Sequence, residues 1–192
     1  MNKSILRTIL AALLLSVAGT APAAGFSYDH AQVTLDDVDF DVPGFNVAGD
    51  GLTFALSHAF HPDYFVSASY GSWDLDGNTD GTQLMLGVGL HSAMNARTDL
   101  VLDAVLGNVE LDSGSSTFDN DFWRFGVALR HNLSNRVEVG GALYYYNFDI
   151  GDSDSAFAFN ALFNLTNEVS ALAAIEFRDD VDILSFGIRY YY

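Results

Sequence analysis

The feature that most constrains the fold of this chain is a strict alternation of bulky apolar residues with small or polar ones. In 123–130 the odd positions hold Trp, Phe, Val and Leu, and the even positions hold Arg, Gly, Ala and Arg. In 184–192 the even positions hold Leu, Phe, Ile, Tyr and Tyr. Side chains of a β-strand point to opposite faces with a period of two, so this pattern predicts strands with one apolar face.

Ten such segments, each of about ten residues, predict a membrane-spanning barrel. Hydrophobic residues make up 49% of the chain and include 15 Phe and 9 Tyr, yet after the N-terminal stretch they are spread out in alternation. A barrel needs only every second residue to face lipid, whereas a soluble sandwich rarely exposes so many aromatics. We therefore expect an all-β fold, a transmembrane antiparallel up-and-down β-barrel of ten strands, with eight as the alternative if 25–41 and a neighbouring segment do not span.

Two kinds of connection alternate along the chain and predict its topology. Short turn-forming segments lie at 61–63, 95–97, 133–135 and 166–167. Longer acidic segments, rich in Gly, Ser and Asp, lie at 36–44, 74–80, 112–121, 149–155 and 179–182. Outer-membrane barrels have short periplasmic turns and longer extracellular loops, so the pattern predicts both termini in the periplasm. The first strand, expected near 27–35, is the least regular.

The first residues have the pattern of a secretory signal peptide. Lys3 and Arg7 precede an apolar stretch from Ile9 to Val17, and 21–24 offers a small-residue cleavage site. The stretch falls short of the roughly 20 residues that a spanning helix needs. We expect residues 1–23 to be a cleaved signal peptide and residues 24–192 to form one barrel domain in the outer membrane of a Gram-negative envelope.

Charge and cysteine content exclude several classes of function. The chain has a formal net charge of −17 and no cysteine. Loss of Lys3 and Arg7 with the signal would leave six arginines and no lysine against 25 acidic residues. So acidic a protein is not expected to bind nucleic acid. Without cysteine the chain cannot form disulfides, carry out thiol chemistry or bind a metal through thiolates.

Charged residues with inward parity are the first candidate site. This lumen charge cluster comprises Asp103, Arg124, Arg130, Glu138, Glu176, Arg178 and Arg189. Charges in a narrow interior have to be paired, because an unpaired buried ion costs several kcal/mol. Small barrels are filled by their side chains, so a packed polar interior is the structural interpretation. A path for protons or small solutes is the functional alternative.

The acidic loops are the second candidate site. Dense carboxylates can bind Ca²⁺ or Mg²⁺, and the divalent ions that cross-link lipopolysaccharide are available at the outer leaflet. The segment 74–80 lacks the spacing and the closing Glu of an EF-hand loop. We expect lipid and lipopolysaccharide as partners and divalent cations as possible ones, but no specific metal site and no cofactor.

No catalytic constellation is apparent. His58, His61, His91 and His131 fall at the expected periplasmic ends of strands, and His30 lies early in the first strand. Barrel enzymes need a His beside a nucleophile near the outer rim, so none of the five is expected to be catalytic. Aromatic residues near the strand ends are expected to form two interfacial girdles: Tyr70, Trp73, Tyr146 and Phe148 on one side, and Phe60, Tyr64, Tyr190 and Tyr192 on the other.

The last strand resembles the signal read by the outer-membrane assembly machinery. Its outward residues are Phe186, Ile188, Tyr190 and Tyr192. Together with the turn His61-Pro62-Asp63-Tyr64, the pattern resembles the small outer-membrane β-barrel proteins of the OmpA/OmpX type and the short acidic barrels like them. Most such chains end in Phe, so Tyr192 departs from the pattern.

That resemblance implies a monomeric envelope barrel without enzymatic activity. The expected function is a contribution to envelope integrity or surface interaction through acidic extracellular loops. A narrow channel for small solutes or ions is one alternative, and a lipid-modifying or proteolytic barrel enzyme is another.

Overall fold

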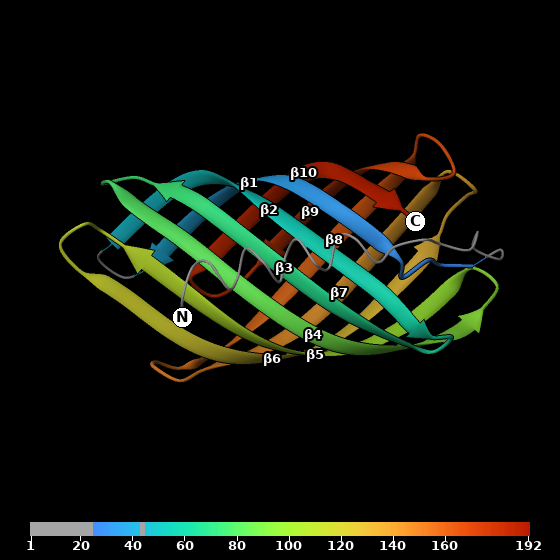
Figure 1. Ribbon diagram of the computed structural model, residues 1–192, viewed down its shortest axis with the longest axis horizontal. Coiled ribbons are helices and arrows are strands. Elements are labelled where there is room, and N and C mark those ends of the chain that lie inside the picture. Colours follow the sequence, from blue (N-terminus) through green and yellow to red (C-terminus); the bar gives the residue numbers. More distant parts are fainter. Residues whose placement is uncertain (1–24, 43–44) are drawn as a thin grey trace.

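Ten antiparallel strands make up the protein in a computed structural model that describes residues 25–42 and 45–192. The predicted signal peptide therefore lies outside the described residues. Figure 1 shows the strands in chain order. Their bounds are β1 His30–Val42, β2 Phe45–His61, β3 Tyr64–Leu75, β4 Thr79–Asn95, β5 Thr98–Asp112, β6 Thr117–Asn132, β7 Val137–Phe148, β8 Ser153–Asn164, β9 Val169–Phe177 and β10 Val181–Tyr191.

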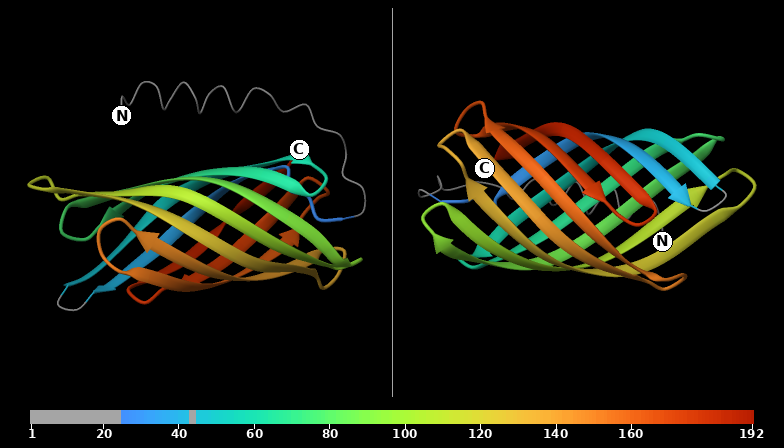
Figure 2. Two further views of the ribbon diagram at one scale, coloured as in Figure 1. Left: turned by 90° about the horizontal axis from the view of Figure 1, so that it is seen from below. Right: turned by 180° about the vertical axis from the view of Figure 1, so that it is seen from behind.

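The sheet closes on itself. Each strand pairs with its neighbours in the chain, and β1 pairs antiparallel with β10 from His30 opposite Tyr191 to Phe40 opposite Val181. Figure 2 shows the tilted strands forming a single closed wall. Closure leaves no free sheet edge, which is the condition for a β-structure to cross a membrane. The predicted ten-strand up-and-down barrel is confirmed, and the eight-strand alternative is wrong.

Two ends of the barrel are distinguished by their connections. The turn end carries the connections 62–63, 96–97, 133–136 and 165–168, together with the segment before β1 and the C-terminal residue. The loop end carries the described connections 76–78, 113–116, 149–152 and 178–180, together with the C-terminal end of β1 and the N-terminal end of β2. Within the described residues, no helix is long and apolar enough to span a membrane.

The outward face carries a continuous apolar belt. Leu35, Leu106 and Phe157 keep 67%, 71% and 55% of their surface exposed, and every strand contributes residues of this kind. On most strands the belt stops toward the loop end at a polar or small residue, as where Leu35 gives way to Asp37 on β1 and Leu106 to Asn108 on β5. An exposed apolar surface of this extent needs a hydrocarbon environment.

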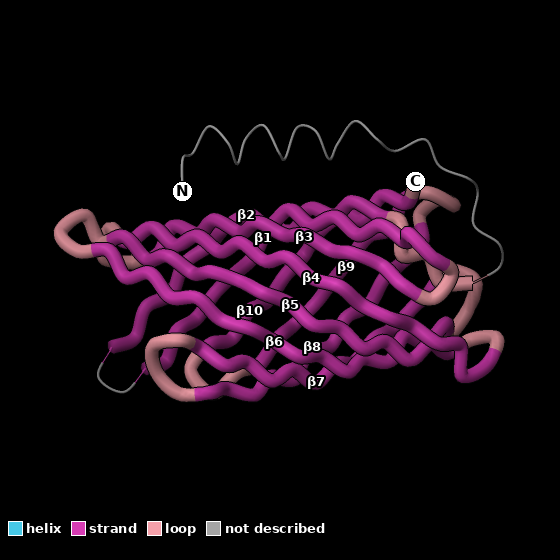
Figure 3. The backbone as a smooth tube through the Cα atoms, turned by 60° about the horizontal axis from the view of Figure 1, so that its bottom comes forward, coloured by secondary structure: helices cyan, strands magenta, loops and turns pink. Residues whose placement is uncertain are grey.

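The strands are longer and the loops shorter than the sequence indicated. Most of the predicted loop 36–44 belongs to β1, and Asp119 and Asp121 lie in β6. Figure 3 shows short connections at both ends of the tube. Beyond the belt the alternation continues with its polarity reversed: Asp37 and Asp39 point outward and are exposed, while Val38 points inward and is 1% exposed. The acidic character that suggested loops is the water-facing side of extended strands.

Apolar side chains fill part of the interior, although the alternation predicted small and polar residues on the inward face. One cluster at the loop end consists of Val38, Val47, Trp73 and Leu75, and another, between β6, β7 and β8, consists of Phe122, Tyr146 and Ala156. Trp73, Tyr146 and Phe148 therefore belong to the interior and not to an interfacial girdle, because their strand parity points them inward. Phe60, Tyr64 and Tyr190 do face outward, with 61%, 47% and 47% exposed.

Candidate functional site: the lumen

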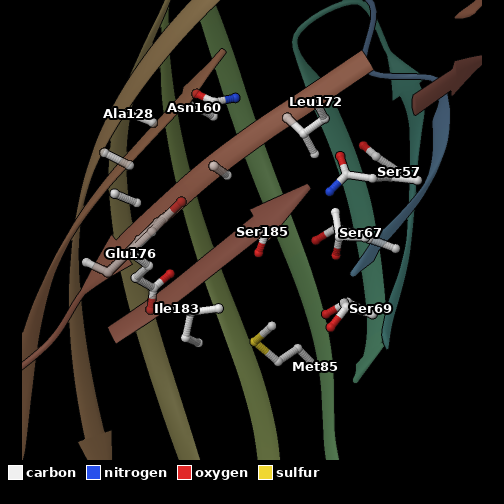
Figure 4. Close-up of a pocket in the computed structure, with 18 of the residues that line it drawn as sticks. Ser57, Ser67, Ser69, Met85, Ala128, Asn160, Leu172, Glu176, Ile183 and Ser185 are labelled. Carbon is white, nitrogen blue, oxygen red and sulfur yellow. The ribbon is translucent and has the colours of Figure 1, made fainter. Parts of the chain in front are cut away.

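A cavity of about 440 Å³ occupies the middle of the barrel. Figure 4 shows its walls, with Ser57, Ser67 and Ser69 along one side and Asn160 and Glu176 on the other. Every strand lines it through inward-facing residues. The strand parity that makes the outside apolar thus collects the polar side chains around one space.

Two of the predicted lumen charges on β6 form direct ion pairs. Arg124 donates from Nη2 to Oδ2 of Asp103 on β5, and its guanidinium lies 4.2 Å from the ring centre of Tyr144. Arg130 holds Glu138 of β7 with two hydrogen bonds, from Nε to Oε1 at 2.7 Å and from Nη2 to Oε2 at 3.0 Å. Bidentate pairing of this kind fixes both side chains and the register of the two strands.

The remaining predicted charges are held differently. Arg178 lies with its Nε 3.3 Å from Oε1 of Glu176, which also accepts a hydrogen bond of 3.0 Å from the hydroxyl of Tyr146. Arg189 donates from Nε and Nη2 to Oε1 of Gln32, at 3.0 and 2.8 Å. The structure brings the first pair together, but Arg189 meets a neutral amide and no carboxylate of the described chain.

Two buried carboxylates were missed by the sequence reasoning. Asp36 is 4% exposed and accepts hydrogen bonds from the hydroxyls of Thr53 and Ser185, at 2.6 and 2.7 Å. Asp99 is also 4% exposed and contacts His91 Nδ1 at 3.1 Å. Both have inward parity, but Asp36 fell in a predicted loop and Asp99 lies beside a predicted turn.

The N-terminal segment packs into the turn end of the lumen. Tyr28 is 5% exposed, packs with Phe65 and Val101, and donates its hydroxyl to Oδ2 of Asp99 at 3.0 Å. Arg130 lies over the rings of Phe26 and Tyr28, at 4.8 and 4.7 Å. Its Nη1 also donates to the backbone oxygen of Ser27 at 3.1 Å. Burial raises the pKa of Tyr28 above its ordinary value.

The sequence predicted no catalytic histidine, and the structure shows which residues the histidines contact. His58 contacts Asp29 at 2.8 Å on the outer face, and His131 contacts the hydroxyl of Thr98 at 2.9 Å. His91 contacts Asp99, whose other partner is Tyr28. Within the described residues, no histidine hydrogen-bonds to a serine, and no three His, Asp or Glu side chains are grouped to hold a metal ion.

The residues of the predicted assembly signal lie on the outer face of β10. Phe186, Ile188 and Tyr190 are 55%, 50% and 47% exposed. Tyr192 follows the strand and donates its hydroxyl to the backbone oxygen of Ser57 on β2 at 2.8 Å. Burial, with Asp29 nearby, raises the pKa of Tyr192.

Comparison with known proteins matches neither a family model nor a curated sequence. Comparison with solved structures does find similar folds. The β-domain of the Bordetella autotransporter BrkA superposes with a TM-score of 0.57 at 12% identity, over 85% of this chain and 98% of that one. The fold is that of an outer-membrane β-barrel.

Two further outer-membrane barrels support this conclusion. The translocator domain of the autotransporter NalP from Neisseria meningitidis has a TM-score of 0.52 at 11% identity, over 98% of this chain and 95% of that one. The KdgM porin in complex with disordered oligogalacturonate has a TM-score of 0.51 at 6% identity, over 85% and 99%. At these identities the likeness concerns the fold alone. The role of this outer-membrane β-barrel therefore has to be inferred from the residues of its own lumen and surface.

Proposed function

We propose that the chain is a monomeric, non-enzymatic outer-membrane protein whose lumen is closed, and that its acidic rim contributes to envelope integrity or surface interaction. The observation that carries this proposal is the packing of side chains into both ends of the lumen. Phe26 and Tyr28 pack into the turn end, and the apolar cluster with Val38 and Trp73 packs into the loop end. Among the described residues, these side chains narrow the path through the barrel, as in other small barrels.

The rim has a defined chemistry at the loop end. Asp37, Asp50, Asp74, Asp80 and Asp112 lie directly opposite one another on β1 to β5, and all five are exposed. We assign the loop end to the cell exterior and the turn end to the periplasm, following the usual orientation of these barrels. There the carboxylates would share the divalent cations of the lipopolysaccharide leaflet.

The proposal includes the route by which the chain reaches the membrane. Residues 1–23 would act as a signal peptide, and Phe186, Ile188, Tyr190 and Tyr192 would be read by the assembly machinery. The resemblance to barrels of the OmpA/OmpX type belongs to the same proposal. The proposal also includes the lack of enzymatic activity, with the partly exposed His91 holding Asp99, the same carboxylate that Tyr28 contacts.

Conductance tests the closed lumen. Purified barrel inserted into a planar lipid bilayer is expected to give no single-channel steps above background. Regular steps in the wild type would overturn the proposal and favour a narrow channel. That alternative is supported by the cavity of about 440 Å³ and its four arginines.

Labelling tests the orientation. The chain has no cysteine, so single Cys residues placed at Asp76, Asp152 and Asp180 of the loop end, and at Ala96 and Asn135 of the turn end, report separately. An impermeant maleimide added to intact cells is expected to label the first three and not the last two. An inverted pattern would place the aspartate row in the periplasm.

A further inference from the structure

Among the described residues, one cation in the lumen has no carboxylate within ion-pair distance. Arg124, Arg130 and Arg178 each lie within ion-pair distance of a carboxylate. Arg189 instead donates two of its five N–H groups to the amide oxygen of Gln32. A guanidinium in the lumen without a compensating charge is unfavourable, so an unpaired Arg189 would weaken the barrel.

The inward carboxylates Glu138, Asp99 and Asp36 have other partners; Asp36 accepts hydrogen bonds from Thr53 and Ser185. Both oxygens of Glu138 accept hydrogen bonds from Arg130. Oδ2 of Asp99 accepts the hydroxyl of Tyr28 and contacts His91 on the opposite wall. Within residues 25–42 and 45–192, no carboxylate lies in ion-pair distance of Arg189.

Two polar atoms on the neighbouring strands β1 and β2 also lack a partner among the described residues. Nδ1 of His30 and Oγ of Ser57 are buried without a hydrogen bond in the described chain, and Ser57 is only 5% exposed. His30 lies directly opposite Ser57 on β2, and Gln32, two residues further along the same inward face, lies opposite Arg189 on β10. His30, Ser57 and Arg189 all line the same cavity.

We propose that this part of the cavity binds a small monovalent anion, a halide or a simple carboxylate. Arg189 would supply the charge, and Oγ–H of Ser57 and Nδ1–H of His30 would each donate a hydrogen bond. Water could satisfy the last two atoms but cannot balance the guanidinium. The cavity is many times larger than the roughly 30 Å³ that one water molecule takes up in the liquid, so an anion fits together with its own waters.

Titration of the folded barrel tests the site. The protein in detergent, in a HEPES buffer free of halide and carboxylate salts, is titrated calorimetrically with sodium bromide and, separately, with sodium formate. One saturable site is expected for at least one anion; binding of bromide alone identifies a halide site, and binding of formate identifies a carboxylate site. In crystals soaked in sodium bromide, an anomalous peak is expected between Arg189 and Ser57.

Variants show whether the binding belongs to this site. Arg189→Gln is expected to weaken binding at least tenfold, and Ser57→Ala, which removes one hydrogen bond, roughly two- to tenfold. The matched control is Arg136→Gln, because Arg136 lies exposed in the connection 133–136 and its loss should leave binding unchanged. Heat-dependent mobility in gel electrophoresis shows whether each variant has folded. If Arg189→Gln does not fold, Ser57→Ala and the bromide peak decide.

Three results would overturn the site: no saturable heat with either anion, unchanged binding in folded Arg189→Gln and Ser57→Ala, or only water beside Arg189 in the soaked crystal. None of these results touches the closed lumen, which the bilayer measurement tests on its own. A silent bilayer with anion binding describes a closed barrel that holds an internal anion. Conductance with anion binding places the same site in an open path.

Discussion

The ring of Tyr28 stacks on the imidazole of His91, with ring centres 3.9 Å apart and planes inclined by 18°. The hydroxyl of the same tyrosine donates to Asp99, which His91 also contacts. Three side chains from the N-terminal segment, β4 and β5 thus form one buried group at the turn end. Because Tyr28 precedes β1, this group fastens the N-terminal segment inside the turn end of the barrel.

Raising the pH should release that segment. Burial raises the folded-state pKa of Tyr28 above its ordinary value near 10, so only the neutral phenol is stabilised in the docked segment. The contribution is therefore fully present below pH 10 and is lost as the pH rises through the raised folded-state value. A fluorophore on Ser27→Cys should show increased mobility above pH 10.

Other tyrosines titrate in the same range, so the control is Tyr28→Phe, in which the same rise in pH should leave the label immobile. Equal release in both proteins would contradict this role of the phenol.

Inward glycines make room for aromatic rings on the adjacent strand, which gives a second prediction. Phe65 lies directly opposite Gly89, and a Cβ on that glycine would fall inside van der Waals distance of the ring. Gly89→Ala is expected to lower the free energy of unfolding by about 1–3 kcal/mol, the usual cost of overpacking. Urea unfolding in detergent measures it.

The control for this substitution is Gly141→Ala. A Cβ on Gly141 would meet its nearest atom, in Phe159, at 3.6 Å, which is an ordinary contact. No loss of stability is expected there. Adding Phe65→Ala to Gly89→Ala should reduce the penalty of the alanine, because the ring it meets is gone. Additive losses in the double variant would show that the ring and the glycine do not interact.

The alternation predicted the barrel and the inward parity of its charges because both follow from the period of two. The number of strands and the inward positions of Arg124, Arg130 and Glu138 needed no knowledge of register. The pairing of Phe65 with Gly89 could not be foreseen, since the register of β3 and β4 depends on the geometry of the connection 76–78 between them.

The sequence also did not predict that apolar side chains pack inside the loop end. In β1 the same alternation runs past the membrane boundary, but there Asp37 faces water and Val38 faces the lumen. A run of acidic residues resembles a loop when only composition is considered. Tyr28 was missed for another reason. The first strand was expected near 27–35 and so included Tyr28, but β1 begins at His30, and the stretch before it has no periodic signal long enough to interpret.

Breaking an internal ion pair gives the third prediction. Arg124 and Asp103 keep 14% and 13% of their side chains exposed. Arg124→Met leaves the carboxylate without its cation, and a loss of roughly 3–5 kcal/mol in unfolding free energy is expected. Arg97→Met, in the exposed turn 96–97, is the control and should change stability by less than about 0.5 kcal/mol. The double variant Arg124→Met with Asp103→Leu should recover much of the loss. A loss in Arg124→Met no larger than in the control would mean that the pair does not stabilise the fold.

The aspartate row on the outer face predicts a dependence on salt. Asp74 of β3 lies directly opposite Asp50 of β2 and Asp80 of β4, and like charges in that arrangement destabilise a sheet by roughly 0.2–1 kcal/mol for each pair. Asp74→Asn removes two such repulsions, so it should raise the free energy of unfolding at low ionic strength. The gain should shrink as sodium chloride approaches about 1 M, where the screening length is near 3 Å.

The control is Asp152→Asn, in the exposed connection between β7 and β8. It removes the same charge away from the row and should have little effect. A gain in Asp74→Asn that does not change with salt would point to packing, and a loss would mean that the carboxylate makes a favourable contact that the repulsion does not outweigh.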